Sequence, residues 1–98
     1  MASFNDIIGS EKPVLVDFYA TWCGPCQALA PILKSVKDEL GDDISIIKID
    51  VDKNPQVASQ HQVRGVPTMI LFSGGKQLWR QSGVLPMAEI IKAIREAM

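Results

Sequence analysis

The 98 residues predict one α/β domain, residues 1–98, in which a central mixed sheet is covered on both faces by helices. Three observations carry this prediction. In the first half, an apolar run, a long amphipathic segment and a second apolar run follow one another, as in a right-handed βαβ unit with parallel strands. A Gly-Gly turn in the second half indicates an antiparallel hairpin. A final amphipathic segment supplies another covering helix.

The βαβ pattern occupies the first half of the chain. Ser3 can cap a short first helix, because its hydroxyl accepts hydrogen bonds from the amides of the first turn. Residues 14–20 are rich in valine and aromatic side chains and predict a buried strand. Leucine and valine recur at helical spacing over residues 24–40, and the apolar run over residues 44–49 predicts the next strand.

The second half of the chain supplies the hairpin and two helices. Pro55 predicts the start of a short helix that ends near Gln60. Residues 68–72 and 76–82 predict two strands joined by the Gly-Gly turn. Pro86 opens the final amphipathic helix. With the two strands of the first half, the predicted sheet has four strands.

The composition excludes several classes of protein. It is 47% hydrophobic and 21% charged, which is enough apolar matter for one core. A net charge of −1 gives no footprint for nucleic acid or an anionic membrane surface. The apolar runs are far shorter than the roughly 20 residues of a membrane span. The first residues lack the pattern of a signal peptide, so a cytoplasmic location is expected.

The motif Trp22-Cys23-Gly24-Pro25-Cys26 holds the only two cysteines of the chain. Two cysteines at this spacing can close a disulfide across one helical turn, and a helix start favours the thiolate. Half a zinc site and a structural disulfide are the alternatives. Structural zinc needs four ligands, and a structural disulfide gains most by closing a long loop. The motif therefore favours redox chemistry.

Asp17 is a carboxyl group inside an apolar strand. Burial raises the pKa of an aspartate, so this group could exchange a proton near neutral pH. The alternative is a structural pair between Asp17 and Lys48, a lysine of the next strand. Taken alone, Lys48 is read as a solvated strand lysine.

One pattern resembles a metal loop but lacks its key residues. Asp50, Asp52 and Asn54 have the spacing that opens a calcium loop, but Pro55 stands where glycine is needed. His61 stands where the loop needs a bidentate glutamate, so we reject this interpretation. We expect His61 to be a surface residue.

The chain resembles the thioredoxin family over about residues 3–98. The resemblance rests on an ordered set of residues: Asp17, Trp22-Cys23-Gly24-Pro25-Cys26, Pro31, Lys48, Arg64-Gly65-Val66-Pro67-Thr68, Gly74-Gly75 and Gly83. It implies a thioredoxin-like α/β fold. Family members usually begin with a further strand, and too few residues precede Ser3 to form it here. We therefore expect a mixed four-stranded sheet instead of five strands, flanked by helices on both faces, with residues 44–49 at an edge.

The resemblance also implies how the thiols react. Cys23 is the implied nucleophile and the more exposed thiol, with a pKa lowered by the helix amides. Cys26, shielded and one turn into the helix, resolves the mixed disulfide. Asp17 lies beneath Cys26 and helps to deprotonate it, and Lys48 moderates Asp17. The dipeptide between the thiols goes with the reducing members of the family.

A substrate-binding surface is implied around Cys23. The bond between Val66 and Pro67 should be cis, with the backbone of Val66 free to pair with an extended substrate segment. Arg64, beside this loop, is either solvated or a partner contact. The expected flat apolar patch consists of Trp22, Gly24, Pro25, Val66, Pro67, Gly83 and Val84.

The function implied is that of a general protein disulfide reductase that cycles a Cys23–Cys26 disulfide. Its partners would be disulfide-containing proteins and an NADPH-dependent flavoprotein thioredoxin reductase, and it would bind no cofactor itself. A monomer is expected, with dimerisation through the edge strand 44–49 as the alternative. Two other functions are an oxidase or isomerase, and a binding module whose redox activity is incidental.

Overall fold

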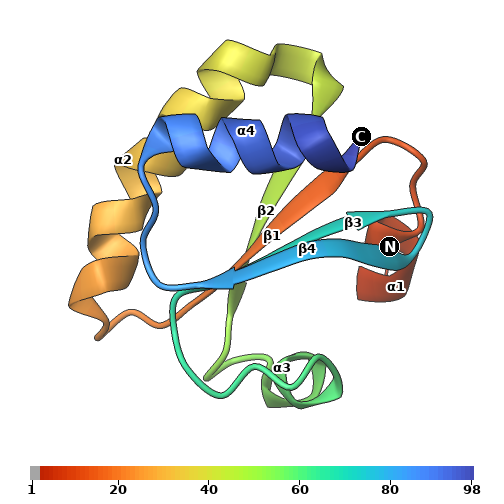
Figure 1. Ribbon diagram of the computed structural model, residues 1–98. Helices are drawn as coiled ribbons and strands as arrows, with labels where there is room; N and C mark the ends of the chain where they lie inside the picture. Colours follow the sequence, from red (N-terminus) through yellow and green to blue (C-terminus); the bar gives the residue numbers. More distant parts are fainter. Residues whose placement is uncertain (1–2) are drawn as a thin grey trace.

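A computed structural model describes residues 3–98 and contains a four-stranded sheet in the order β2-β1-β3-β4 (Figure 1). β1 and β2 are parallel, and β3 is antiparallel to both β1 and β4. The strands are β1 (Val14–Tyr19), β2 (Ser45–Asp50), β3 (Thr68–Ser73) and β4 (Lys76–Ser82). The predicted mixed sheet, with β2 at one edge, is confirmed for these residues; any strand before Ser3 lies outside them.

Helices cover both faces of this sheet. They are α1 (Phe4–Ile8), α2 (Gly24–Leu40), α3 (Pro55–Gln60) and α4 (Met87–Ala97), with a short 3-10 turn, η1 (Gly41–Asp43), after α2. α2 and α4 lie on one face, whereas α1 and α3 lie on the other (Figure 1). The strand predicted over 44–49 is displaced by one residue, because Ser45 pairs with Val14 and Asp50 with Tyr19.

Successive side chains of β1 point to opposite faces of the sheet and pack in two separate cores. Leu15 of β1 packs with Leu29 and Ile90 between the sheet and the pair α2 and α4. Its neighbour Val16 points the other way and packs in the core under α1, because successive side chains of a strand face opposite sides. β1 is therefore buried on both faces, which explains its nearly continuous apolar sequence.

The first helix is capped as predicted and is anchored by an aromatic cluster. The Ser3 hydroxyl accepts from the Asp6 amide, and the Asp6 carboxylate accepts from the Ser3 amide, both at 3.2 Å. The Phe4 ring lies 6.4 Å from the Phe18 ring and 6.2 Å from the Phe72 ring, centroid to centroid. These contacts fix α1 against β1 and β3.

The expectation that His61 is a surface residue was wrong. Its ring is half-buried in the same cluster, 5.3 Å from the Phe4 ring and 5.2 Å from the Phe72 ring. The end of α3 places it over the sheet, where burial, and then the charge of Arg80, lower the pKa of the imidazole. Neutral imidazole can be packed among aromatic rings at low cost, so the residue serves the core.

Removing the Phe4 ring is expected to destabilise the domain by about 2 kcal/mol. This is less than the usual loss for a fully buried phenylalanine, because the Phe4 ring is only half-buried. The measurement is urea unfolding of Phe4→Ala beside Asn5→Ala, an exposed neighbour on the same helix. A loss below about 0.5 kcal/mol, the usual range of surface substitutions, would show that α1 is not anchored through this ring.

Candidate active site

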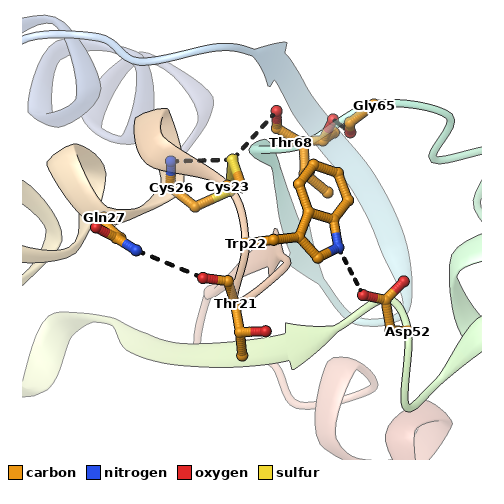
Figure 2. The surroundings of a disulfide bond; sticks show 9 residues. Thr21, Trp22, Cys23, Cys26, Gln27, Asp52, Gly65 and Thr68 are labelled. Carbon is orange, nitrogen blue, oxygen red and sulfur yellow. Dashed lines mark hydrogen bonds between the residues drawn. A yellow bond between two sulfur atoms is a disulfide. The ribbon is translucent and has the colours of Figure 1, made fainter.

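The two cysteines form a disulfide across the first turn of α2 (Figure 2). Cys23 is the N-cap residue, and its Cα lies 5.3 Å from that of Cys26. The Cys26 amide donates a hydrogen bond to the Cys23 sulfur at 3.2 Å. When the disulfide is reduced, the same amide and the helix dipole favour a thiolate on Cys23.

The difference in exposure that is predicted for the two reduced thiols is not seen between the cysteines of the disulfide form. Cys23 is 4% exposed and Cys26 is 5% exposed. Both pack in a small cluster with Ala20, against partly buried Val51 and Val66, so neither sulfur stands out from the surface. Accessibility in this state therefore does not assign the nucleophile, and the assignment of Cys23 rests on its position at the helix start.

The loop before β3 faces the disulfide. The peptide bond between Val66 and Pro67 is cis, as predicted, and the Val66 carbonyl oxygen lies 3.7 Å from the Cys23 sulfur. The Thr68 hydroxyl donates to the Gly65 carbonyl at 2.8 Å and closes the loop. The Gly83 amide donates to the Pro67 carbonyl at 2.9 Å, which brings the segment after β4 to the same place.

The predicted apolar patch comes from three distant segments of the chain. Trp22, Gly24, Pro25 and Val84 are exposed, with Trp22 at 71%, and Val66 and Gly83 are half-buried. Pro67 is buried, so it shapes the loop and contributes little surface. Gly83 has a φ of +88°, a conformation that glycine adopts without strain.

Sequence reasoning missed the residue that holds the tryptophan. The Trp22 indole N–H donates to the Asp52 carboxylate at 2.9 Å (Figure 2). The loop that carries Asp52 is folded around Asp50, whose Oδ1 accepts from the amides of Asp52 at 2.9 Å and Lys53 at 3.3 Å. The Asp-x-Asp pattern that starts at Asp50, the last residue of β2, is the available signal for this loop.

Removing the Asp52 carboxylate is expected to free the indole of Trp22 and to raise KM for a protein disulfide about two- to fivefold, with kcat nearly unchanged. The measurement is steady-state reduction kinetics of Asp52→Ala, with Lys53→Ala as the control from the same exposed loop. Equal KM values for both variants would show that the hydrogen bond does not order the substrate surface.

Asp17 is a buried carboxyl group near Cys26. It is 1% exposed, and its Oδ1 has no hydrogen-bond partner among the described residues. Burial raises the pKa of Asp17 to about 6, and the charge of Lys48, its partner in the β1–β2 register, opposes that rise. A cavity of about 230 Å³ is lined by Asp17, Cys26 and Lys48, so the carboxyl and the thiol share one space.

This cavity offers a route for a proton between Asp17 and Cys26 that does not require direct contact. A space of this size can hold water, and water between a carboxylate and a thiol conducts a proton. Lys48 is exposed at its edge, with its ammonium 5.9 Å from the centre of the Tyr19 ring. The arrangement can take a proton from Cys26 near neutral pH.

Residues 3–98 contain neither a cluster of metal-ligating side chains nor a helix that could span a membrane. No group of three or more His, Cys, Asp and Glu side chains in this range is placed to hold a metal ion. No helix in the same range combines the length and the apolar composition needed to cross a bilayer.

A Cys-x-x-Cys disulfide in the first turn of a helix, within a fold that contains a βαβ unit, is a redox motif of the thioredoxin-like class. The model of the thioredoxin family matches residues 1–96. The chain belongs to the thioredoxin family.

Relatives and a solved structure agree with this assignment. The chain is 48% identical over 98 residues to the chloroplastic thioredoxin Y of Oryza sativa, covering 99% of this chain and 58% of the rice protein. It is 48% identical over 95 residues to a thioredoxin-like protein of Synechocystis, covering 96% and 90% of the two chains. A mutant thioredoxin from Halobacterium salinarum superposes with a TM-score of 0.86 at 39% identity, covering 95% of this chain and 80% of the other.

One relative joins two functions in a single chain. A bifunctional thioredoxin reductase/thioredoxin of Mycobacterium leprae is 43% identical over 95 residues, which cover 97% of this chain and 21% of that protein. This chain therefore spans a small part of that relative and somewhat more than half of the rice protein.

Proposed function

We propose that this protein is a general protein disulfide reductase. The observation that carries the proposal is the hydrogen bond from the Cys26 amide to the Cys23 sulfur at the start of α2, because it stabilises a thiolate at the edge of an apolar surface. Gly24 and Pro25 between the thiols support reduction of substrate disulfides over their formation, because this dipeptide goes with the reducing members of the family. The flat surface around Trp22 suits a flexible protein segment better than a small molecule.

The proposed reaction transfers two electrons through a mixed disulfide. The Cys23 thiolate attacks one sulfur of a substrate disulfide, a Cys23–substrate bond forms, and the other substrate sulfur leaves as a thiolate. Cys26 then gives its proton to Asp17 and attacks the Cys23 sulfur. The second substrate thiolate leaves, and the Cys23–Cys26 disulfide is restored. Substrate is reduced and the domain is oxidised.

The oxidised domain needs an electron donor. We propose an NADPH-dependent flavoprotein thioredoxin reductase, which the fused reductase of the Mycobacterium leprae relative supports. In this proposal the domain carries electrons on its own disulfide, binds no cofactor and works as a monomer. Pairing of two copies through the exposed edge of β2 is the alternative state, which sedimentation of the purified protein would detect.

The test is the reduction potential of the Cys23–Cys26 couple, measured in graded thiol–disulfide buffers. A value near −270 mV is expected, and this figure is that of thioredoxin itself, adopted here as the reference. A value between about −180 and −120 mV would contradict the proposal, because couples in that range act as isomerases or oxidases.

A further inference from the structure

A second pocket lies close to the disulfide and has no role in the mechanism above. It measures about 340 Å³ and lies against α3 and the two loops that flank it. Its lining residues are Val51, Pro55, Ala58, Ser59, Gln62, Val63 and Arg64. Buried Ala58 and half-buried Val51 and Val63 give it an apolar floor, and Ser59, Gln62 and Arg64 form an exposed polar rim.

The pocket adjoins the redox site. Val51, which lines it, packs against the cluster that contains both cysteines. At the other end, Arg64 stands two residues before Val66, whose carbonyl oxygen lies 3.7 Å from the Cys23 sulfur. A substrate segment whose cysteine reaches Cys23 therefore has this pocket within a few residues of its own length.

Arg64 gives the pocket lining a positive charge, although the whole chain has a net charge of −1. None of the lining residues is acidic, and within residues 3–98 no carboxylate lies at salt-bridge distance from Arg64. Asp52, the residue after Val51, is not a lining residue, and its carboxylate accepts a hydrogen bond from the Trp22 indole. Arg80 donates to the carbonyls of His61 at 2.6 Å and Gln62 at 2.8 Å, so a second guanidinium lies behind the rim.

We propose that this pocket is a substrate subsite that selects disulfide proteins with an acidic side chain close to the target cysteine. The inference rests on the proposed reductase function and names the class of substrate that it favours. The carboxylate of the substrate pairs with the Arg64 guanidinium, and the methylene groups of that side chain lie on Val51 and Val63. Because the pair is at a solvent-exposed rim, it changes the choice of substrate more than the maximum rate.

The test compares matched disulfide peptides. One series carries a glutamate at each position two to five residues before or after the target cysteine, and its twin series carries glutamine. Wild type, Arg64→Gln and Arg64→Glu are assayed for kcat/KM at low and at high salt. Arg95→Gln is the control, because Arg95 is an exposed arginine on α4 on the other face of the sheet.

The wild-type protein is expected to favour the glutamate peptide about two- to fivefold at one or more positions, with the preference falling at high salt. Arg64→Gln should lose the preference, Arg64→Glu should reverse it, and Arg95→Gln should keep it. Equal rates for the twin series with wild type, or an equal slowing of both by Arg64→Gln, would overturn the subsite. Failure of the wild type to reduce either series would overturn the reductase function itself.

Discussion

Cys23→Ser is expected to lose disulfide reduction down to the uncatalysed background, whereas Cys26→Ser is expected to stop at a stable mixed disulfide. The first variant lacks the thiolate that the helix start stabilises, and serine has no comparable nucleophile at neutral pH. The second variant keeps the attacking thiolate but has no group to release the substrate. The two substitutions therefore differ in product as well as in rate.

The products can be separated on a non-reducing gel and weighed by mass spectrometry after mixing each reduced variant with a disulfide-bonded protein. The double variant Cys23→Ser/Cys26→Ser is the control and should form no adduct. The nearly equal exposure of the two cysteines makes this experiment decisive. An adduct formed by Cys23→Ser instead of Cys26→Ser would assign the nucleophile to Cys26.

Asp17→Asn is expected to stabilise the protein by about 1 to 3 kcal/mol at pH 8. The pKa of Asp17 is raised from 3.8 to about 6 by burial, and holding that carboxylate ionised costs about 3 kcal/mol. Asparagine removes the charge. Its buried amide lacks a full set of hydrogen-bond partners, however, and this offsets part of the gain in stability.

The raised pKa of Asp17 also predicts how the stability of the domain changes with pH. Between pH 4 and 6 the folded protein binds more protons at Asp17 than the unfolded chain does, so the free energy of unfolding contributed by Asp17 falls as pH rises through that window. Asp17→Asn should remove this fall. Urea unfolding from pH 4 to 8 measures it, with Asp43→Asn, an exposed acid of η1, as the control. Parallel curves for wild type and Asp17→Asn would contradict the raised pKa.

The same substitution should slow the release of substrate. Without the carboxylate in the shared cavity, deprotonation of Cys26 depends on bulk water, and the resolution step is expected to slow by on the order of a hundredfold at pH 7. Stopped-flow decay of the mixed disulfide measures this step alone. Because the variant is expected to be more stable than wild type, a slower step cannot be explained by loss of the fold.

The sequence was sufficient for the features that depend on local pattern. The long helix over residues 24–40 and the hairpin around the Gly-Gly turn follow from periodicity and turn chemistry, and both have the predicted bounds or differ by one residue. The resemblance then located the cis bond before Pro67. Strand ends differ by a residue because pairing partners, and not composition, decide where a strand stops.

Features that depend on tertiary neighbours could not be predicted in the same way. The partner of Trp22 is Asp52, which is 30 positions away, and no local signal joins an indole to a particular carboxylate. His61 is half-buried only because α3 ends over the Phe4 and Phe72 rings. The equal burial of the two cysteines likewise depends on Val51 and Val66, which come from other segments.

The surface around the disulfide exists only in the completed fold. Cys23, Val66 and Gly83 meet through contacts that span most of the chain, and the Gly83 amide reaches Pro67 only when β3 and β4 are paired. A fragment that keeps the Cys-x-x-Cys motif but ends before β4 would retain two thiols and lose the binding surface. The activity and the folded structure should therefore be lost in the same unfolding transition, so that activity reports the integrity of the whole domain.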